Sequence, residues 1–406
     1  MHGMVTQSLP QVGVVGKPNV GKSTFFAAAT MIDVKIAPYP FTTVEPNVGI
    51  GHVRIKCVCT ELGVRDDPRN SICLEGNRLV PVELIDVAGL VPGAWQGRGL
   101  GNQFLDHLRR ASALIHVVDA SGGTDEEGRL ARPGSRDPML DVEFLEGEVT
   151  MWMIQIMRKD WDKMARLVDY AKKPLVGVLY DHLSGLGISE AVISATLVEL
   201  GLDKKPLHSW SEDDLRQFMG LLRSRSKPMV IAANKIDVPE AEDNVKRMMK
   251  ELGDRVIPTS AEAELALRKA AGKGLVKYIP GDPSFEVVAR DLPQAQRAAL
   301  DRIADLMRRW GGTGVVQAIN KTVLGVLGMV AVYPVADEKR FTDTEGRVLP
   351  DVVLVPGDYT VLDLAKSIHS DVASKAMFAI DAVSGRRLGL DAKVWHRAVI
   401  RIVTSK

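Results

Sequence analysis

The stretch GKPNVGKST, residues 16–24, decides the fold of the first part of the chain. It has the spacing Gly-x4-Gly-Lys-Ser, it follows the apolar run QVGVVG at 11–16, and a helix-compatible run follows it. Glycines at both ends of such a loop let backbone N–H groups surround phosphate oxygens, and the helix N-terminus adds its positive end. The spacing therefore predicts a phosphate-binding loop in which Lys22 reaches the β- and γ-phosphates and the Ser23 hydroxyl binds Mg²⁺. The other loop residues expected to contact the nucleotide are Asn19, Val20, Gly21 and Thr24.

Further apolar runs rich in β-branched residues follow this loop. They are VGIGHVRIKC (48–57), LVPVELID (79–86), SALIHVVD (112–119), KPMVIAAN (227–234) and DRVIPTS (254–260). Most are followed by turn or polar residues, and helix-compatible stretches separate them, which is typical of parallel strands in a doubly wound sheet. The pattern predicts an α/β fold of the P-loop type.

The tetrapeptide NKID, which begins at Asn234, follows one of these predicted strands. The Asp237 carboxylate can accept two parallel hydrogen bonds, a geometry that matches guanine N1–H and its 2-amino group. Adenine offers no such pair of donors. Asn234 and the stem of Lys235 are expected to shape and cover the base, and a backbone N–H of Ser260 or Ala261 is expected to contact guanine O6. These residues predict GTP or GDP as the ligand.

Two other stretches are expected to form nucleotide-dependent switch loops. YPFTTVEPNVG, at 39–49, offers Thr42 and Thr43, and we expect Thr43 to bind Mg²⁺ and the γ-phosphate. In LIDVAGLVPG, at 84–93, Asp86 is expected to hold Mg²⁺ through water and the Gly89 N–H to contact the γ-phosphate. The predicted metal ligands are therefore Ser23, Thr43 and Asp86. The predicted catalytic groups are Lys22, Thr43 and Gly89.

A long insertion separates two of the predicted strands. More than a hundred residues lie between the runs at 112–119 and 227–234, whereas a crossover between parallel strands needs about 10 to 30. Residues 121–140 are polar with Gly and Pro, and we interpret them as a mobile linker. An imperfect apolar stripe from Met153 to Leu167 predicts that helices follow. The predicted domains are a discontinuous P-loop domain (8–120 and 227–280), an inserted helical domain (121–226), a helical connector (281–330) and a small α+β domain (331–406).

The composition excludes some classes of protein. A 46% hydrophobic and 25% charged chain with net charge +1 has no global field that argues for nucleic acid or membrane. The most apolar run, at 323–335, is too short to span a bilayer, so a cytoplasmic location without membrane association is expected. Cys57, Cys59 and Cys73 include no second pair at metal-ligand spacing, and we interpret them as small core or surface residues.

Together these motifs resemble the Obg-like GTPases, and specifically the YchF subfamily in its archaeal form. The stretches that carry the resemblance are KPNVGKST, YPFTTVEPNVG, DVAGLVPGAWQGRGLGNQFLDHLRRA and SAEAEL. The C-terminal stretch at 332–369 resembles a TGS domain, a ubiquitin-like β-grasp module. The resemblance covers nearly the whole chain and is weakest over 121–226, where the family has a helical domain. It implies a GTP-hydrolysing switch that acts on ribosomes or structured RNA through the TGS and helical domains. Basal turnover is expected to be slow, because Mg²⁺, Lys22 and backbone donors would stabilise charge but none of them aims the attacking water.

The resemblance leaves the nucleotide and the catalyst open. Bacterial and eukaryotic relatives have glutamate in place of the aspartate of Asn-Lys-x-Asp and prefer ATP, whereas this chain keeps Asp237. An ATP-preferring ATPase with a stress-response or regulatory role is the alternative. Family members also have a hydrophobic residue, here Leu90, where other GTPases have a water-orienting glutamine. Asn19 either helps bind K⁺ near the phosphates or only stabilises the loop, and a partner is the other source of the missing catalyst.

The TGS-like region is the expected docking surface. It has eight Lys or Arg and three Asp from Lys366 onward, against three Lys or Arg and seven Asp or Glu at 331–365. Such a split suits phosphate contacts, and a solvated face is an equally open interpretation. The sequence does not indicate an oligomeric state.

Overall fold

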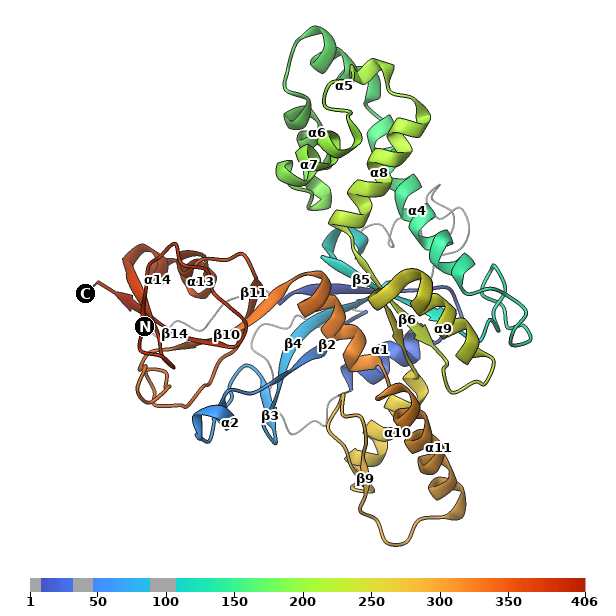
Figure 1. The fold of residues 1–406 in the computed structure, drawn as a ribbon, viewed down its shortest axis with the longest axis vertical. Coiled ribbons are helices and arrows are strands. Elements are labelled where there is room, and N and C mark those ends of the chain that lie inside the picture. The colour runs from blue at the N-terminus through green and yellow to red at the C-terminus, as the bar shows by residue number, and fades with distance from the viewer. Residues whose placement is uncertain (1–8, 32–46, 88–106, 406) are drawn as a thin grey trace. The chain divides into compact units, whose positions relative to one another are not determined.

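The computed structural model describes residues 9–31, 47–87 and 107–405, and the chain divides into two compact units. We call them the P-loop unit (11–26 and 85–263) and the C-terminal unit (27–84 and 264–406, with the residues before Gln11). Figure 1 shows the elements of both. Each unit is described by itself.

The P-loop unit contains a parallel sheet in the order β1-β5-β6-β7. These strands are β1 (Gln11–Val15), β5 (Ala113–Asp119), β6 (Met229–Asn234) and β7 (Val256–Pro258). β4 (Asn77–Asp86) ends in this unit beside β1, where the Val87 N–H donates to the Val14 carbonyl at 3.0 Å. Every residue of β5 and β6 is buried, as expected for strands covered on both faces. The α/β fold predicted from the sequence is confirmed.

Of the α-helices whose full bounds are described, three lie outside the insertion and begin in the P-loop unit. They are α1 (Lys22–Thr30), α9 (Ala241–Leu252) and α10 (Ala261–Gly272). α1 and α10 begin directly after the loops that follow β1 and β7, so their N-termini lie at the edge where the parallel strands end. Ligands of open α/β sheets bind at that edge.

The insertion of the P-loop unit is helical, as predicted. Its helices are α4 (Met139–Arg158), α5 (Trp161–Ala165), α6 (Leu175–Leu183), α7 (Glu190–Leu200) and α8 (Glu212–Ser226) (Figure 1). Local signals set their ends: Ser189 and Ser211 cap α7 and α8, and Gly201 ends α7 in the left-handed region at φ +67°. Trp210 packs against Trp161 and Phe218, with ring centroids 5.8 and 5.2 Å apart.

The C-terminal unit contains a five-stranded sheet in the order β11-β10-β14-β12-β13. Its strands are β10 (Met329–Val335), β11 (Val353–Pro356), β12 (Ala376–Asp381), β13 (Arg387–Leu388) and β14 (Ala398–Thr404). The central strands β10 and β14 are parallel, and α13 (Val361–Ile368) packs on the sheet through Val361 and Leu364. Thr360 begins α13 with a capping box. The predicted β-grasp fold is confirmed.

The remaining elements of this unit include β2 (Val48–Lys56), the short helix α2 (Cys59–Leu62) and β3 (Ile72–Leu74). β3 and β4 form a hairpin whose turn, Glu75–Gly76, has both φ angles positive. The others are β8 (Val276–Lys277), β9 (Glu286–Val287), α11 (Gln294–Trp310), α12 (Val315–Asn320) and α14 (Ser370–Lys375). Among the described residues there is no helix with the length and apolar character needed to cross a bilayer.

Candidate nucleotide-binding site

The phosphate-binding loop runs from β1 into α1 and requires its glycines. A side-chain carbon at Gly16 would lie 2.6 Å from the Val117 carbonyl of β5. Gly21 has φ +92°, and a side-chain carbon there would lie 2.3 Å from Asn234 Nδ2. Both glycines therefore allow a close approach of the loop to the sheet, and larger residues at these two positions would push it away.

A pocket of about 480 Å³ lies over this loop. Its lining residues are Lys17, Pro18, Asn19, Gly21, Lys22, Ser23, Thr24, Asn234, Lys235, Asp237, Ala261 and Glu262. The structure thus brings the phosphate loop and the Asn-Lys-x-Asp segment, which are about 210 positions apart in the sequence, around one cavity of ligand size. Of the other predicted nucleotide contacts, Val20 and Ser260 are buried beside the pocket.

Lys22 and Asp86 form an ion pair at the phosphate end of the pocket. Lys22 is the first residue of α1, and Asp86 is the last residue of β4. The predicted phosphate-binding lysine thus contacts the predicted metal-binding carboxylate directly. The predicted switch residues Thr42, Thr43, Gly89 and Leu90 lie outside the described residues.

Asn234 joins the two halves of the pocket. Its Nδ2 donates to the Val20 carbonyl at 2.9 Å, and its Oδ1 accepts from the Ala261 N–H at 3.0 Å. The side chain is only 3% exposed and uses both ends of its amide internally. Asn234 therefore fixes the phosphate loop relative to the start of α10, and its expected role in covering the base stays a prediction. The Ala261 N–H, expected to contact guanine O6, is engaged by this amide.

Lys235 and Asp237 have separate partners. Lys235, at φ +69°, has its Nζ 2.8 Å from the Asp119 carboxylate. Asp237 Oδ1 accepts from the Ser260 hydroxyl at 2.7 Å, and Ser260 Oγ accepts in turn from the Ala263 N–H at 3.3 Å. The Ser260 side chain therefore orients the carboxylate that was expected to select the base.

Asp119 is a site residue that the sequence analysis missed. It ends β5 and pairs in register with Asn234 at the end of β6. Its Oδ1 accepts from the Ser121 hydroxyl at 2.5 Å, which leaves Oδ2 to Lys235. The available signal was its position, because a carboxylate that ends a buried parallel strand lies at the ligand-binding edge of the sheet.

The start of the insertion contacts the phosphate loop. Lys17, which is 3% exposed, donates to the Asp125 carbonyl at 2.6 Å and forms an ion pair with Asp141 of α4 at 2.7 Å. Asn19, at φ +63°, donates from Nδ2 to the Gly128 carbonyl at 2.9 Å. The interpretation of 121–140 as a mobile linker is therefore wrong, because its backbone carbonyls hold two side chains of the loop.

A buried histidine lies behind the loop. His116 of β5 is paired in register with Val15, the last residue of β1. Burial, and secondarily the nearby Lys17 charge, lower the pKa of His116 to about 3. The imidazole is therefore neutral near pH 7, and Asp141 is the anionic partner of Lys17.

Comparison with known proteins agrees with this geometry. Family models match three stretches: a 50S ribosome-binding GTPase at 11–142, the G4 motif-containing domain of YGR210-like Obg-like GTPases at 232–337, and a TGS domain at 341–404. An uncharacterized GTP-binding protein of Methanocaldococcus jannaschii is 48% identical over 399 residues, which cover 98% of this chain and 100% of that protein. The ribosome-binding ATPase YchF of Bacillus subtilis is 31% identical over 246 residues, covering 58% and 60%.

Solved structures give the same result. A GTP-binding protein of Pyrococcus horikoshii superimposes with a TM-score of 0.78 at 39% identity, over 97% of this chain and 100% of that one. The YchF GTPase of Schizosaccharomyces pombe has a TM-score of 0.59 at 18% identity, over 97% of both chains, and supports the fold. The resemblance drawn from the motifs is confirmed. The chain therefore belongs to the Obg-like GTPases of the YchF type and contains a TGS domain.

Proposed function

We propose that this protein is a Mg²⁺-dependent switch that prefers GTP to ATP, hydrolyses it slowly and acts on ribosomes in the cytoplasm. The observation that carries the proposal is the single pocket shared by Lys22, Ser23 and Asp237. It provides phosphate-binding groups at one end and a base-selecting carboxylate at the other.

The guanine preference rests on Asp237. A carboxylate has about four acceptor positions, and Ser260 occupies one of them. The oriented group can still accept two hydrogen bonds from guanine N1–H and the 2-amino group. Adenine would leave this carboxylate without those donors, and an unmade hydrogen bond in a closed site costs about 1–3 kcal/mol.

The metal site is proposed from the chemistry of its donors. The Ser23 hydroxyl and the Asp86 carboxylate are oxygen ligands of the kind that Mg²⁺ prefers, with Thr43 as the third proposed ligand. Lys22 pairs with Asp86 in this structure. When a nucleotide binds, Lys22 would turn to the β- and γ-phosphates, and a second cation would then have to neutralise Asp86. Mg²⁺, when bound, would neutralise charge on the same phosphate oxygens.

Slow hydrolysis is expected because the proposed catalytic groups include none that orients the attacking water. Lys22, Thr43 and the Gly89 N–H would stabilise charge on the γ-phosphate, but none of them orients the attacking water. Asn19 holds Nδ2 toward Gly128, so Oδ1 is the atom that would coordinate a K⁺ ion beside the phosphates. K⁺ or a bound partner would then accelerate the reaction.

The ribosome is proposed as partner from the names of the relatives and of the matching family model. We propose the TGS and helical domains as the docking surface. The basic half of the TGS domain is partly neutralised, because Lys366, Arg397 and Arg401 form ion pairs with carboxylates. Recognition of RNA phosphates there would have to displace some of these pairs.

Nucleotide titration of the unaltered chain and of Asp237→Asn tests the guanine preference. We expect the unaltered chain to bind GTP about 100-fold more tightly than ATP, which corresponds to two hydrogen bonds of ordinary strength. Asp237→Asn should lose most of this preference and gain affinity for xanthosine triphosphate, whose 2-oxo group accepts from the new amide. Equal binding of ATP and GTP by the unaltered chain would favour the ATPase alternative.

Co-sedimentation with ribosomes tests the partner. We expect more protein in the ribosomal pellet with a non-hydrolysable GTP analogue than with GDP. Lys22→Ala should remove this nucleotide dependence. Equal recovery in all nucleotide states would contradict a switch that acts on the ribosome.

A further inference from the structure

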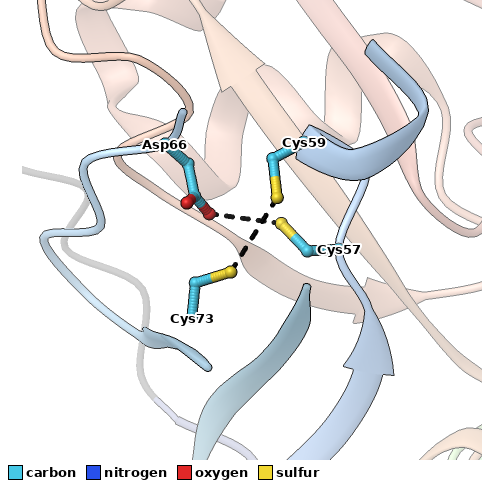
Figure 2. A group of neighbouring side chains, drawn as sticks. All are labelled: Cys57, Cys59, Asp66 and Cys73. Atoms are coloured by element: carbon cyan, nitrogen blue, oxygen red, sulfur yellow. Dashed lines mark hydrogen bonds between the residues drawn. The ribbon is translucent and has the colours of Figure 1, made fainter. Parts of the chain in front are cut away.

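We propose that Cys57, Cys59, Cys73 and Asp66 bind one Zn²⁺ ion at a structural site in the C-terminal unit. Figure 2 shows the four side chains converging from three neighbouring segments. One ligand atom from each lies within 4.8 Å of those of the other three. The site is separate from the nucleotide pocket, whose lining residues belong to the P-loop unit.

Two distances between ligand atoms match a tetrahedral zinc site. Cys59 Sγ and Cys73 Sγ are 3.9 Å apart, and Cys57 Sγ lies 3.3 Å from Asp66 Oδ2. With Zn–S bonds of about 2.3 Å and Zn–O bonds of about 2.1 Å, tetrahedral angles give edges of about 3.8 Å for S–S and 3.6 Å for S–O. Both measured edges are within about 0.3 Å of those lengths. A disulfide would need the two sulfurs to approach to about 2.05 Å.

Local structure sets the positions of the ligands. Cys57 directly follows β2, Cys59 is the first residue of α2, and Cys73 is the middle residue of β3. The Cys57 N–H donates to the Gly76 carbonyl at 2.8 Å, which ties the end of β2 to the β3–β4 turn. Four protein ligands complete a tetrahedral shell without an open position, so the site is structural and not catalytic.

The charges around the cluster favour a bound cation. Arg78, whose side chain is 0% exposed, has Nη1 2.7 Å from the Asp66 carboxylate and donates from Nη2 to the Leu349 carbonyl. The Tyr333 hydroxyl donates to Cys57 Sγ at 3.8 Å. Three thiolates, one carboxylate, Zn²⁺ and Arg78 would together carry one net negative charge, and both donors would stabilise the ligand set from outside.

This environment does not fit the interpretation of these cysteines as ordinary core residues. A buried free cysteine behaves as a small apolar side chain and packs among apolar neighbours. Here the thiols contact one another, a carboxylate and a phenol, beside a buried guanidinium. Since Arg78 also binds the Leu349 carbonyl, the metal would fix the 57–78 segment against residues that precede β11.

Metal analysis of the 406-residue chain, purified without chelator, tests the site directly. We expect about one zinc per chain, and exchange for Co²⁺ should give the thiolate-to-cobalt charge-transfer absorption of tetrahedral sulfur ligation. The chain has three cysteines, so a thiol titration reports on this cluster alone. All three thiols should be protected until a strong zinc chelator is added. Metal-free protein with three reactive thiols, or with a Cys59–Cys73 disulfide, would overturn the proposal.

Variants then separate ligation from packing. Cys59→Ser and Asp66→Ala should each lower zinc affinity by at least about 10-fold, since each removes one ligand. Val58→Ala is the matched control, because Val58 is 4% exposed and lies between two ligands without offering a donor. It should keep one zinc per chain. If Val58→Ala lost the metal as readily as Asp66→Ala, the four side chains would not be the ligand set. The measurements on the unaltered chain decide the matter even if a variant fails to fold.

Discussion

The nucleotide pocket and the cysteine cluster differ in how their charges are balanced. Around the pocket each lysine has an internal carboxylate: Lys17 pairs with Asp141, Lys22 with Asp86, and Lys235 with Asp119. In the cluster, four ligands that can each carry a negative charge face one buried cation, Arg78. The pocket is thus neutralised before its ligand arrives, and a nucleotide exchanges one partner of Lys22 for another. As thiolates, the three cysteines together with Asp66 would carry more negative charge than Arg78 alone can offset, so the cluster can ionise fully only around an added cation.

The largest effect that this comparison predicts is at Lys22. Lys22→Ala should weaken GTP binding by about 100-fold or more, because it removes the charge nearest the β- and γ-phosphates. The melting temperature should change little, since Asp86 has a 22% exposed side chain and water can replace its partner. Titration calorimetry and thermal unfolding measure the two quantities.

The matched substitution is at Lys17, whose carboxylate partner is buried, unlike the partner of Lys22. Lys17→Ala would leave the carboxylate of Asp141, 4% exposed, with only Arg136 at 3.2 Å. Stability should fall more than for Lys22→Ala, because an under-compensated buried charge is costly. Similar losses of stability in the two variants would show that the lysines are not divided between ligand and fold in this way.

The next effect is a loss of stability at acid pH. Acid should destabilise both units, whereas zinc removal should destabilise the cysteine cluster. Burial, and secondarily a nearby cation, lower the pKa of His116 and of His52 to about 3, from about 6.5 when unfolded. The unfolded chain binds more protons between pH 6.5 and 3, so stability is complete above pH 6.5 and falls as pH falls through this range. At pH 5 each histidine should cost about 2 kcal/mol.

Urea unfolding at pH 7 and pH 5 measures this cost. His116→Gln and His52→Gln should each reduce the loss between the two pH values relative to the unaltered chain. A pH dependence that neither substitution changes would mean that carboxylates, and not these histidines, cause the acid sensitivity.

The sequence predicts the groups that face the nucleotide better than it predicts the internal partners of those groups. The phosphate loop and the Asn-Lys-x-Asp segment have fixed spacings because a single turn must present several groups to one ligand, and the strands carry clear apolar runs. The partners of those groups have no such spacing. Two examples are the hydrogen bonds that Asn234 makes with Val20 and Ala261 and the ion pair between Asp119 and Lys235. Both depend on the register between strands, which cannot be read from the sequence.

The cysteines show the same limit. The sequence offers no second Cys-x-Cys pair, because in the proposed site one thiol comes from a hairpin strand and the fourth ligand is Asp66. The interpretation of 121–140 as a linker failed for a related reason. Its composition is polar, but two of its carbonyls accept hydrogen bonds from side chains of the phosphate loop. No local sequence pattern predicts these contacts. The domain boundaries set from the sequence stay a prediction.

A smaller effect tests whether this segment supports the pocket. Gly128 and Gly134 have φ +80° and +78°, so alanine at either should cost about 1 kcal/mol of backbone strain. At Gly128 the added carbon would also lie 2.7 Å from the Pro18 carbonyl, whereas at Gly134 nothing lies within 4 Å. Gly128→Ala should therefore weaken GTP binding several-fold, and Gly134→Ala should not. Equal affinities in the two variants would mean that the segment lies beside the loop without supporting it.

The smallest effect concerns K⁺. Because the pocket is already neutralised by its own carboxylates, a monovalent ion should add only modest stabilisation, and we expect hydrolysis to rise by less than about 10-fold when Na⁺ is exchanged for K⁺ at constant ionic strength. Asn19→Gly should erase the rise. Glycine is the sharper substitution than alanine, because Asn19 has φ +63° and glycine keeps that backbone without strain. Equal rates in the two salts for the unaltered chain would remove the K⁺ proposal and leave Asn19 as the side chain that fastens the phosphate loop to Gly128. The catalyst would then have to come from a bound partner, and ribosomes added to the same assay should raise the rate in either salt.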